Sequence, residues 1–220
     1  MSWEKIVPLV LEGLGETLYM TLPSTLLSYL VGMPLGILLV VTAPDGIRPR
    51  PAFNAALGVA INFLRSIPFI ILLAMLFPVT RAIMGRAIGT QAIIFPLVIS
   101  AFPYVARMVE GSIREVDRGV IEAAQSLASS DLQIIGKVMI PEALPSLLNG
   151  AAIVMVTILG YTAMASAAGG GGLGAIAITK GLNLRRMDVM YTAAIALVFL
   201  VQLITLFGNR VTKKLDHRKR

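Results

Sequence analysis

The feature that most constrains this chain is a series of long stretches with almost no charged side chain. Five stretches have this character, at residues 17–44, 52–78, 87–106, 143–179 and 189–209. Only the second contains a charge, at Arg65. Each stretch reaches the roughly 20 apolar residues that an α-helix needs to cross a bilayer. The sequence therefore predicts an all-α integral membrane protein with five transmembrane helices.

Composition supports the same class. The chain has 220 residues, of which 56% are hydrophobic and 14% are charged, and its mean hydropathy is +0.82. A soluble domain carries about 25% charged residues, and a chain of this length cannot bury so much apolar surface in a soluble core. We expect a single transmembrane domain over residues 1–220. The predicted spans are 17–43, 52–78, 87–110, 141–165 and 188–209.

Some chemistries are excluded by residue type. The chain has no cysteine, which excludes disulfides and thiolate metal sites. Its single histidine, His217, lies in a basic C-terminal tail, so we predict no metal site. The N-terminal apolar run is interrupted by Glu12 and Glu16 and is not followed by a signal-peptide cleavage site. We therefore expect the first span to remain in the mature protein.

The basic residues predict an orientation. Five spans place the two termini on opposite sides of the membrane. Twelve basic residues then fall on the side of the C-terminus and six on the side of the N-terminus. The side richer in Lys and Arg usually faces the cytoplasm, so we expect the N-terminus outside and the C-terminus in the cytoplasm. The net charge of +7 fits this topology and contact with anionic lipid, and we expect no nucleic-acid partner.

Two spans contain features that allow more than one interpretation. Gly32 and Gly36 have the spacing of a close-packing helix face, although they could also be ordinary glycines of a span. Arg65 lies inside the second span, where an arginine either faces protein or water or extends to a headgroup. Pro68 is expected to break that helix about one turn later.

The segment between the third and fourth spans, residues 114–140, is polar but prone to form helix. Arg107, Glu110 and Arg114 have i,i+3 and i,i+4 spacing, so ion pairs should extend the third span beyond the membrane. A first short helix should follow Gly119, with an apolar face at Val120, Ala124 and Leu127.

A second short helix should follow a turn at Ala128–Ser129. Ser130 and Gln133 have the spacing of a capping box, and the apolar stripe is predicted at Leu132, Ile135 and Val138. Pro141 suits the first turn of the next span. The two helices form either a knob that receives force from a partner or an interfacial hairpin that lies on lipid.

This segment resembles the cytoplasmic coupling loop of ABC importer permeases, with the pattern EAA-x3-G-x9-I-x-LP. The matching residues are Glu122, Ala123, Ala124, Val138, Ile140 and Pro141, with Ala128 in place of the glycine. We call residues 114–140 the coupling loop. Over nearly its full length the chain is similar to the permease subunit of bacterial methionine importers. The motifs that carry this likeness are FLRSIPFI at 63–70, ARMVE at 106–110, LP at 144–145, GYTAM at 160–164 and GGLG at 171–174.

The resemblance implies a non-enzymatic subunit that forms the path for L- and D-methionine across the cytoplasmic membrane. Its implied partners are a second copy of itself, two ATP-binding subunits, an extracytoplasmic methionine-binding protein and membrane lipid. ATP and Mg are expected in the ATPase, because this chain lacks the GxxxxGK[ST] phosphate loop and holds no cofactor of its own. A glycine pattern at Gly169, Gly171 and Gly174 matches a dinucleotide fingerprint, but no strand precedes it, so we expect a tight external loop.

The resemblance also assigns candidate residues. Those expected to dock the ATPase are Glu122, Ala123, Ala124, Ala128, Leu132, Val138 and Pro141. Arg65, Tyr161 and Met164 are candidates for the path or its gate, with simple packing as the alternative for Met164. At Ala128, where the family has glycine, we expect either a right-handed turn or a bend absorbed by Ser129 and Ser130.

Other functions remain as alternatives. The chain could serve an importer of another amino acid or small nutrient, or act as a stand-alone secondary carrier. A proton-coupled carrier would need a carboxylate inside the membrane, and we place Glu110 and Glu122 at or beyond its edge. A membrane enzyme would need clustered histidines, cysteines or paired carboxylates, which the sequence lacks.

Overall fold

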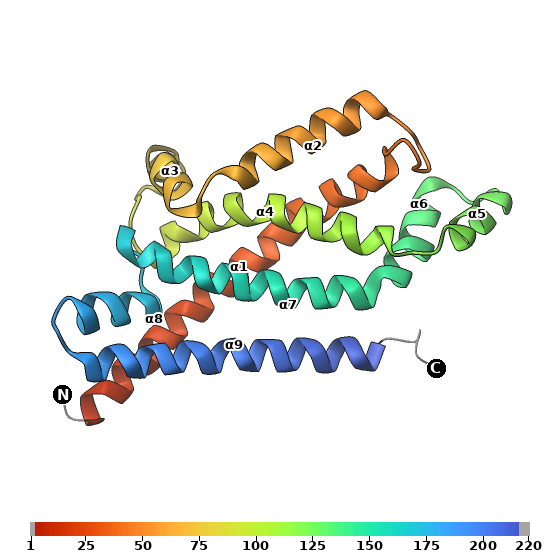
Figure 1. The fold of residues 1–220 in the computed structure, drawn as a ribbon. Coiled ribbons are helices and arrows are strands. Elements are labelled where there is room, and N and C mark those ends of the chain that lie inside the picture. Colours follow the sequence, from red (N-terminus) through yellow and green to blue (C-terminus); the bar gives the residue numbers. More distant parts are fainter. Residues whose placement is uncertain (1–2, 216–220) are drawn as a thin grey trace.

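The computed structural model describes residues 3–215, and all regular structure in that range is helical. The long helices are α1 (Trp3–Val41), α2 (Pro51–Ser66), α3 (Phe69–Met84), α4 (Thr90–Arg114), α7 (Ile140–Ala165) and α9 (Met187–Leu215). The short helices are α5 (Arg118–Ser126), α6 (Asp131–Ile134) and α8 (Gly172–Ala175), with a 3₁₀ turn at Ser166–Ala168 and π-helical segments at Ile135–Met139 and Ile176–Leu182. Figure 1 shows α5 and α6 at one end of the molecule and α8 at the other.

The number of predicted spans is confirmed if one bent pair of helices counts as a span. Within residues 3–215, four helices are long and apolar enough to cross a membrane, and α2 with α3 makes a fifth although they meet at 101°. The bend lies at Ile67 and Pro68, as predicted for the proline. Proline has no N–H to donate and disfavours the helical conformation at the residue before it. Residues 52–78 therefore do not form one straight helix.

Two helices extend beyond the predicted spans. α1 begins at Trp3 rather than near residue 17 and has 39 residues, so it is about 58 Å long at 1.5 Å per residue. Charged residues such as Glu12 and Glu16 lower the hydropathy there, but glutamate is a good helix former. In the other case, α6, the π-helical turn and α7 form one continuous helix of 35 residues, Asp131–Ala165.

α1 and α4 pack closely along a stripe of small residues. A Cβ atom added at Gly32 would lie 2.6 Å from the carbonyl oxygen of Phe102, and one at Gly36 would lie 2.5 Å from that of Ala106. No side chain fits at such distances, so the backbones meet directly. The close-packing interpretation of these two glycines is therefore correct.

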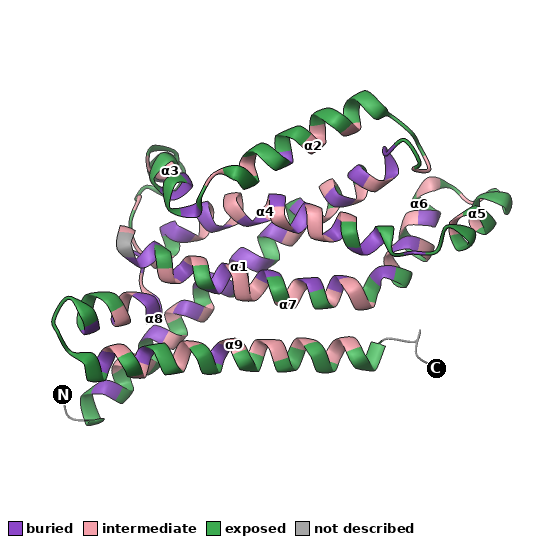
Figure 2. Ribbon diagram, in the orientation of Figure 1, coloured by how far each residue is buried: buried purple, intermediate pink, exposed green. Residues whose placement is uncertain are grey.

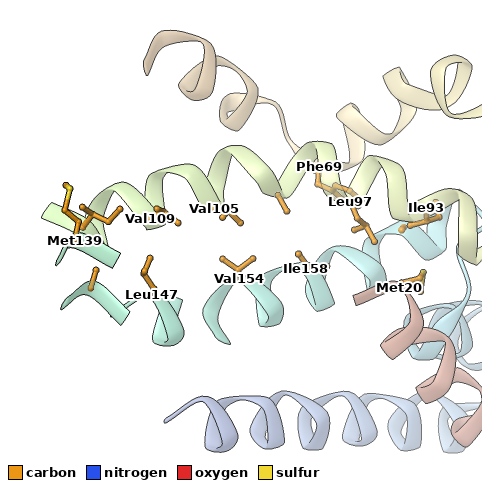
Figure 3. Packing of buried hydrophobic residues seen from close by; sticks show 14 of the residues in the cluster. Met20, Phe69, Ile93, Leu97, Val105, Val109, Met139, Leu147, Val154 and Ile158 are labelled. Carbon is orange, nitrogen blue, oxygen red and sulfur yellow. The ribbon is translucent and has the colours of Figure 1, made fainter. Parts of the chain in front are cut away.

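The core lies between α1, α3, α4 and α7, and α9 contributes little to it. Figure 3 shows the buried side chains of α4, among them Leu97, Val105 and Val109, facing those of α7, among them Leu147 and Val154. α9 is mostly exposed in Figure 2, although its outer residues are apolar. Apolar side chains on the outside are what a lipid-facing helix requires.

Candidate functional site

The first short helix of the coupling loop, α5, begins at Arg118, although it was predicted to begin after Gly119. Asp117 caps α5, because its Oδ1 accepts a hydrogen bond of 2.7 Å from the N–H of Gly119. Ala124 packs against the main core together with Ile121, while Glu122 and Ala123 are exposed. The predicted apolar face is wrong at Val120 and Leu127, because both point outward.

The turn after α5 places Ala128 in the left-handed region, with φ of 55°. The N–H of Ser129 donates to the carbonyl of Ala124 at 3.2 Å, and the N–H of Ala128 donates to that of Gln125 at 2.9 Å. This is the Schellman pattern that normally ends in glycine. Both expectations for this turn are therefore wrong, since Ala128 itself takes up the bend at a cost of about 1–2 kcal/mol.

The second short helix has the predicted capping box but a different buried face. Gln133 Oε1 accepts from the N–H of Ser130 at 2.9 Å, and Ser130 Oγ accepts from the N–H of Gln133 at 3.4 Å. The predicted stripe is wrong at Leu132, which is exposed, but Ile135 packs against the core as predicted. The fully buried residues here are Ile134 and Met139. Ile134 and Met139 are five residues apart, which is the repeat of the π-helical turn between α6 and α7.

The remaining docking candidates lie where this continuous helix leaves the coupling loop. Val138 is half-buried in the π-helical turn, and Pro141 is exposed in the first turn of α7, as predicted. No break separates α6 from α7, so the coupling loop joins the bundle through a continuous helix.

Two leucines near the middle of the coupling loop are the most exposed large apolar side chains of the described residues. Leu127 is 81% exposed and Leu132 is 82% exposed, on either side of the Ala128 turn. Figure 1 shows this turn projecting beyond the ends of the long helices. Exposed apolar side chains outside the bundle are typical of a contact surface for a partner.

Two of the three path candidates, Arg65 and Tyr161, lie close to the break between α2 and α3. Arg65, near the end of α2, is exposed, and its Cζ is 5.8 Å from the ring centroid of Tyr104. Tyr161 of α7 stacks on Phe69, the first residue of α3, with centroids 4.7 Å apart. Met164 is 52% exposed one turn further along α7, so it is not a core residue within this chain. Their roles in a path stay a prediction.

The glycine-rich segment after α7 is a close-packed loop around a carboxylate that the sequence analysis missed. Glu16 Oε2 accepts from the N–H of Gly172 at 2.6 Å, and Thr17 Oγ1 accepts from the N–H of Leu173 at 2.9 Å. A Cβ atom at Gly171 would lie 2.5 Å from Glu16 Oε2. The glycines therefore let the backbone approach Glu16. The signal in the sequence was the pair of Glu16 with Thr17, although nothing there identifies a partner 156 residues away.

The predicted ion pairs at the end of α4 are present. The carboxylate of Glu110 accepts from Arg107 Nη1 at 2.6 Å and from Arg114 Nε at 3.3 Å. Two further charged residues, Asp45 and Arg48, contact the coupling loop from the connection between α1 and α2. The sequence gives no local sign of these contacts, because the partners of Asp45 and Arg48 lie 73 and 83 residues away.

Comparison with known proteins agrees with this architecture. A protein of Vibrio cholerae named probable D-methionine transport system permease protein MetI is 42% identical over 210 residues, which cover 96% of this chain and 93% of that relative. A protein of the same name from Haemophilus influenzae is 45% identical over 204 residues, or 92% and 95% of the two chains. A chain in a solved structure described as inward-facing conformations of the MetNI methionine ABC transporter matches with a TM-score of 0.96 and 42% identity, over 99% of this chain and 100% of that one.

The family model described as binding-protein-dependent transport system inner membrane component matches residues 20–220. That range includes the coupling loop, the break between α2 and α3, and the glycine-rich segment. The match covers most of the length of this multi-pass inner-membrane protein, and the chain belongs to the family of binding-protein-dependent transport system inner membrane components.

Proposed function

We propose that this chain is the transmembrane subunit of an ATP-driven importer and forms the translocation path for methionine. The observation that carries the proposal is the likeness to relatives named as methionine permeases, at 42–45% identity over more than nine-tenths of both chains. The TM-score of 0.96 with a chain of a methionine ABC transporter supports it. The names of the relatives favour D-methionine, and we extend the substrate to both enantiomers.

The proposed partners follow from what the chain has and lacks. The exposed Leu127 and Leu132 offer an apolar contact for an ATPase, and the ATPase would bind ATP and Mg because this chain has no phosphate-binding loop. Two copies of the chain would line one path between two ATPase subunits. An extracytoplasmic binding protein would deliver the substrate. The chain itself would carry out no bond-breaking chemistry.

In the proposed orientation the coupling loop and the C-terminus are cytoplasmic and the N-terminus is outside. The excess of basic residues on the C-terminal side supports this orientation. Closure of the ATPases on ATP would then displace the coupling loop, and the continuous Asp131–Ala165 helix would transmit that displacement into the bundle.

Reconstitution tests the function. The chain, its ATPase and its binding protein are placed in proteoliposomes, and ATP hydrolysis and uptake of labelled L- and D-methionine are measured together. We expect uptake only when all three components and ATP are present. Uptake by the chain alone would identify a secondary carrier, and stronger stimulation by another amino acid would identify a different nutrient importer. Labelling of a cysteine introduced at Leu127 from the outside only would refute the orientation.

A further inference from the structure

The short connection between α1 and α2, residues 42–50, contacts both helices of the coupling loop. Arg48 Nε donates to Asp131 Oδ2 at 2.6 Å, at the first residue of α6. The carboxylate of Asp45 pairs with Arg118, at the first residue of α5, and lies 3.8 Å from Arg114 Nη1. One connection of nine residues therefore holds the beginnings of α5 and α6 through side chains of opposite charge.

This connection is itself fixed to the ends of α1 and α2. The N–H of Arg48 donates to the carbonyl of Val41 at 3.0 Å, and the N–H of Arg50 donates to that of Thr42 at 2.9 Å. From α2, Asn54 Nδ2 donates to the carbonyl of Leu39 at 2.6 Å. A displacement of Asp45 or Arg48 would therefore move the end of α1 and the beginning of α2 with it.

The charged contacts continue along α4 to the middle of α2. Glu110 joins Arg114 to Arg107, as described above. Arg107 Nη2 then donates to the carbonyl of Gly58 at 3.0 Å, and its Nε donates to Asn62 Oδ1 at 3.2 Å. A connected series of polar contacts thus runs from α5 to α2, the helix that ends near Arg65 at the break before α3.

A polar cavity lies between this network and Glu122 of the coupling loop. Its volume is about 150 Å³, and its lining includes Asp45, Arg114, Arg118, Glu122 and Met139. The coupling loop is therefore not packed tightly against the connection between α1 and α2 at this point. The ion pairs bridge a space that packing leaves open.

These pairs add little to folding stability. Their effect is on the position of the coupling loop relative to the connection between α1 and α2. The side chains of Arg48 and Arg118 are 70% and 68% exposed, and exposed ion pairs contribute almost nothing measurable to stability in many proteins. The core between α4 and α7 holds the fold without them. Their contribution lies in fixing two segments relative to each other, because within residues 3–215 each pair joins two elements that no other ion pair joins.

We propose that Asp45 and Arg48 are positioning residues that attach the coupling loop to the connection between α1 and α2, and so carry its displacement into α2. The inference rests on the proposed function and adds a second route to the one through α4 and α7. We call the pairs of Asp45 with Arg118 and of Arg48 with Asp131 the charged clamp. It makes the movement of α2 depend on the same displacement that drives α7.

An exchange of charges tests the charged clamp. Arg48→Asp, Asp131→Arg and the double variant are reconstituted with the ATPase and the binding protein, and the number of ATP molecules hydrolysed per methionine taken up is measured. Each single variant should raise this ratio about threefold to tenfold. The double variant should return it to within about twofold of the unchanged complex. Restoration would report the contact itself, because the double variant keeps both substitutions and any disturbance that each causes in its own segment.

Two controls separate the charged clamp from general effects. Glu115→Gln removes a carboxylate of the same loop that forms no ion pair within residues 3–215, and it should leave the ratio unchanged. Because the chain has no cysteine, Arg48→Cys with Asp131→Cys can be joined by a short thiol cross-linker. Uptake should survive cross-linking if the two segments move together, and its loss on cross-linking would overturn the proposal.

The outcomes distinguish this inference from the proposed function. An unchanged complex that shows no ATP-driven uptake would refute the proposed function. A working complex whose single variants keep a normal ratio would refute only the charged clamp. If a single variant fails to retain the ATPase during purification, the double variant must recover it, and a double variant that does not recover also overturns the inference.

Discussion

Two short helical segments connect long helices at opposite ends of this molecule, and they differ in how much of their apolar surface the chain itself covers. The segment Gly172–Leu182 buries Gly172, Leu173 and Gly174 against α1 and α7. The coupling loop instead exposes Leu127 and Leu132 (Figure 1). The beginning of the first segment is covered by the chain itself, whereas the turn of the second presents two leucines that the chain does not cover. The comparison shows that local helix content does not distinguish a segment that packs against its own chain from one that leaves large apolar side chains exposed.

The largest effect should come from disturbing the buried beginning of the first segment. Gly172→Ala places a Cβ atom 2.6 Å from Thr17 Oγ1 at a residue whose φ is +90°, and we expect a loss of about 3 kcal/mol in stability. Thermal unfolding of the purified protein in detergent would show a lower Tm. Gly160→Ala is the matched control, because nothing lies within 4 Å of its added Cβ atom. Equal Tm values for the two variants would show that the segment is not tightly packed.

An intermediate effect should come from charging the exposed leucines. Leu127→Asp and Leu132→Asp should leave the Tm nearly unchanged, because surface substitutions usually alter stability by less than about 0.5 kcal/mol. Each should weaken binding of the ATPase by about 2 kcal/mol, or roughly thirtyfold. Titration of the ATPase against the permease in nanodiscs measures this affinity. Leu127→Met keeps the apolar surface and should bind normally. Retained affinity in both Asp variants would remove the leucines from the interface.

The smallest effect should come from the turn between them. Ala128→Gly relieves a left-handed alanine and should raise stability by about 1 kcal/mol. Ala123→Gly is the matched control, because it changes an exposed alanine of α5 with helical backbone and should lower stability by about 1 kcal/mol. Denaturation of the two variants in parallel, followed by circular dichroism, would show shifts of opposite sign. A shift of the same sign in both would mean that the turn carries no strain.

Local patterns predicted this structure well where neighbouring residues decide the outcome. Uncharged runs gave the spans, the spacing of Ser130 and Gln133 gave a capping box, and the position of Pro68 gave the break. Each depends on residues within a few positions of one another. The resemblance to permeases then selected the coupling loop, although the roles of its residues stay predictions.

Contacts between distant segments could not be predicted in this way. The partner of Glu16 is Gly172 and that of Arg48 is Asp131, and such pairs depend on how complete helices pack. The angle of 101° at Pro68 likewise depends on what α3 packs against. The wrong prediction for Leu132 had a local cause, because an i,i+3 pattern assumes α-helical geometry and Ile135–Met139 is π-helical.

The π-helical turn decides which way the second short helix faces. Each residue of an α-helix advances the direction of its side chain by about 100°, and a π turn holds one residue more than the α-helical turn it replaces. The azimuth of Leu132 about the helix axis is therefore set by the residue count of Ile135–Met139 and not by the sequence of α6. Leu132 faces outward on a helix continuous with α7 because the π-helical turn contains one additional residue.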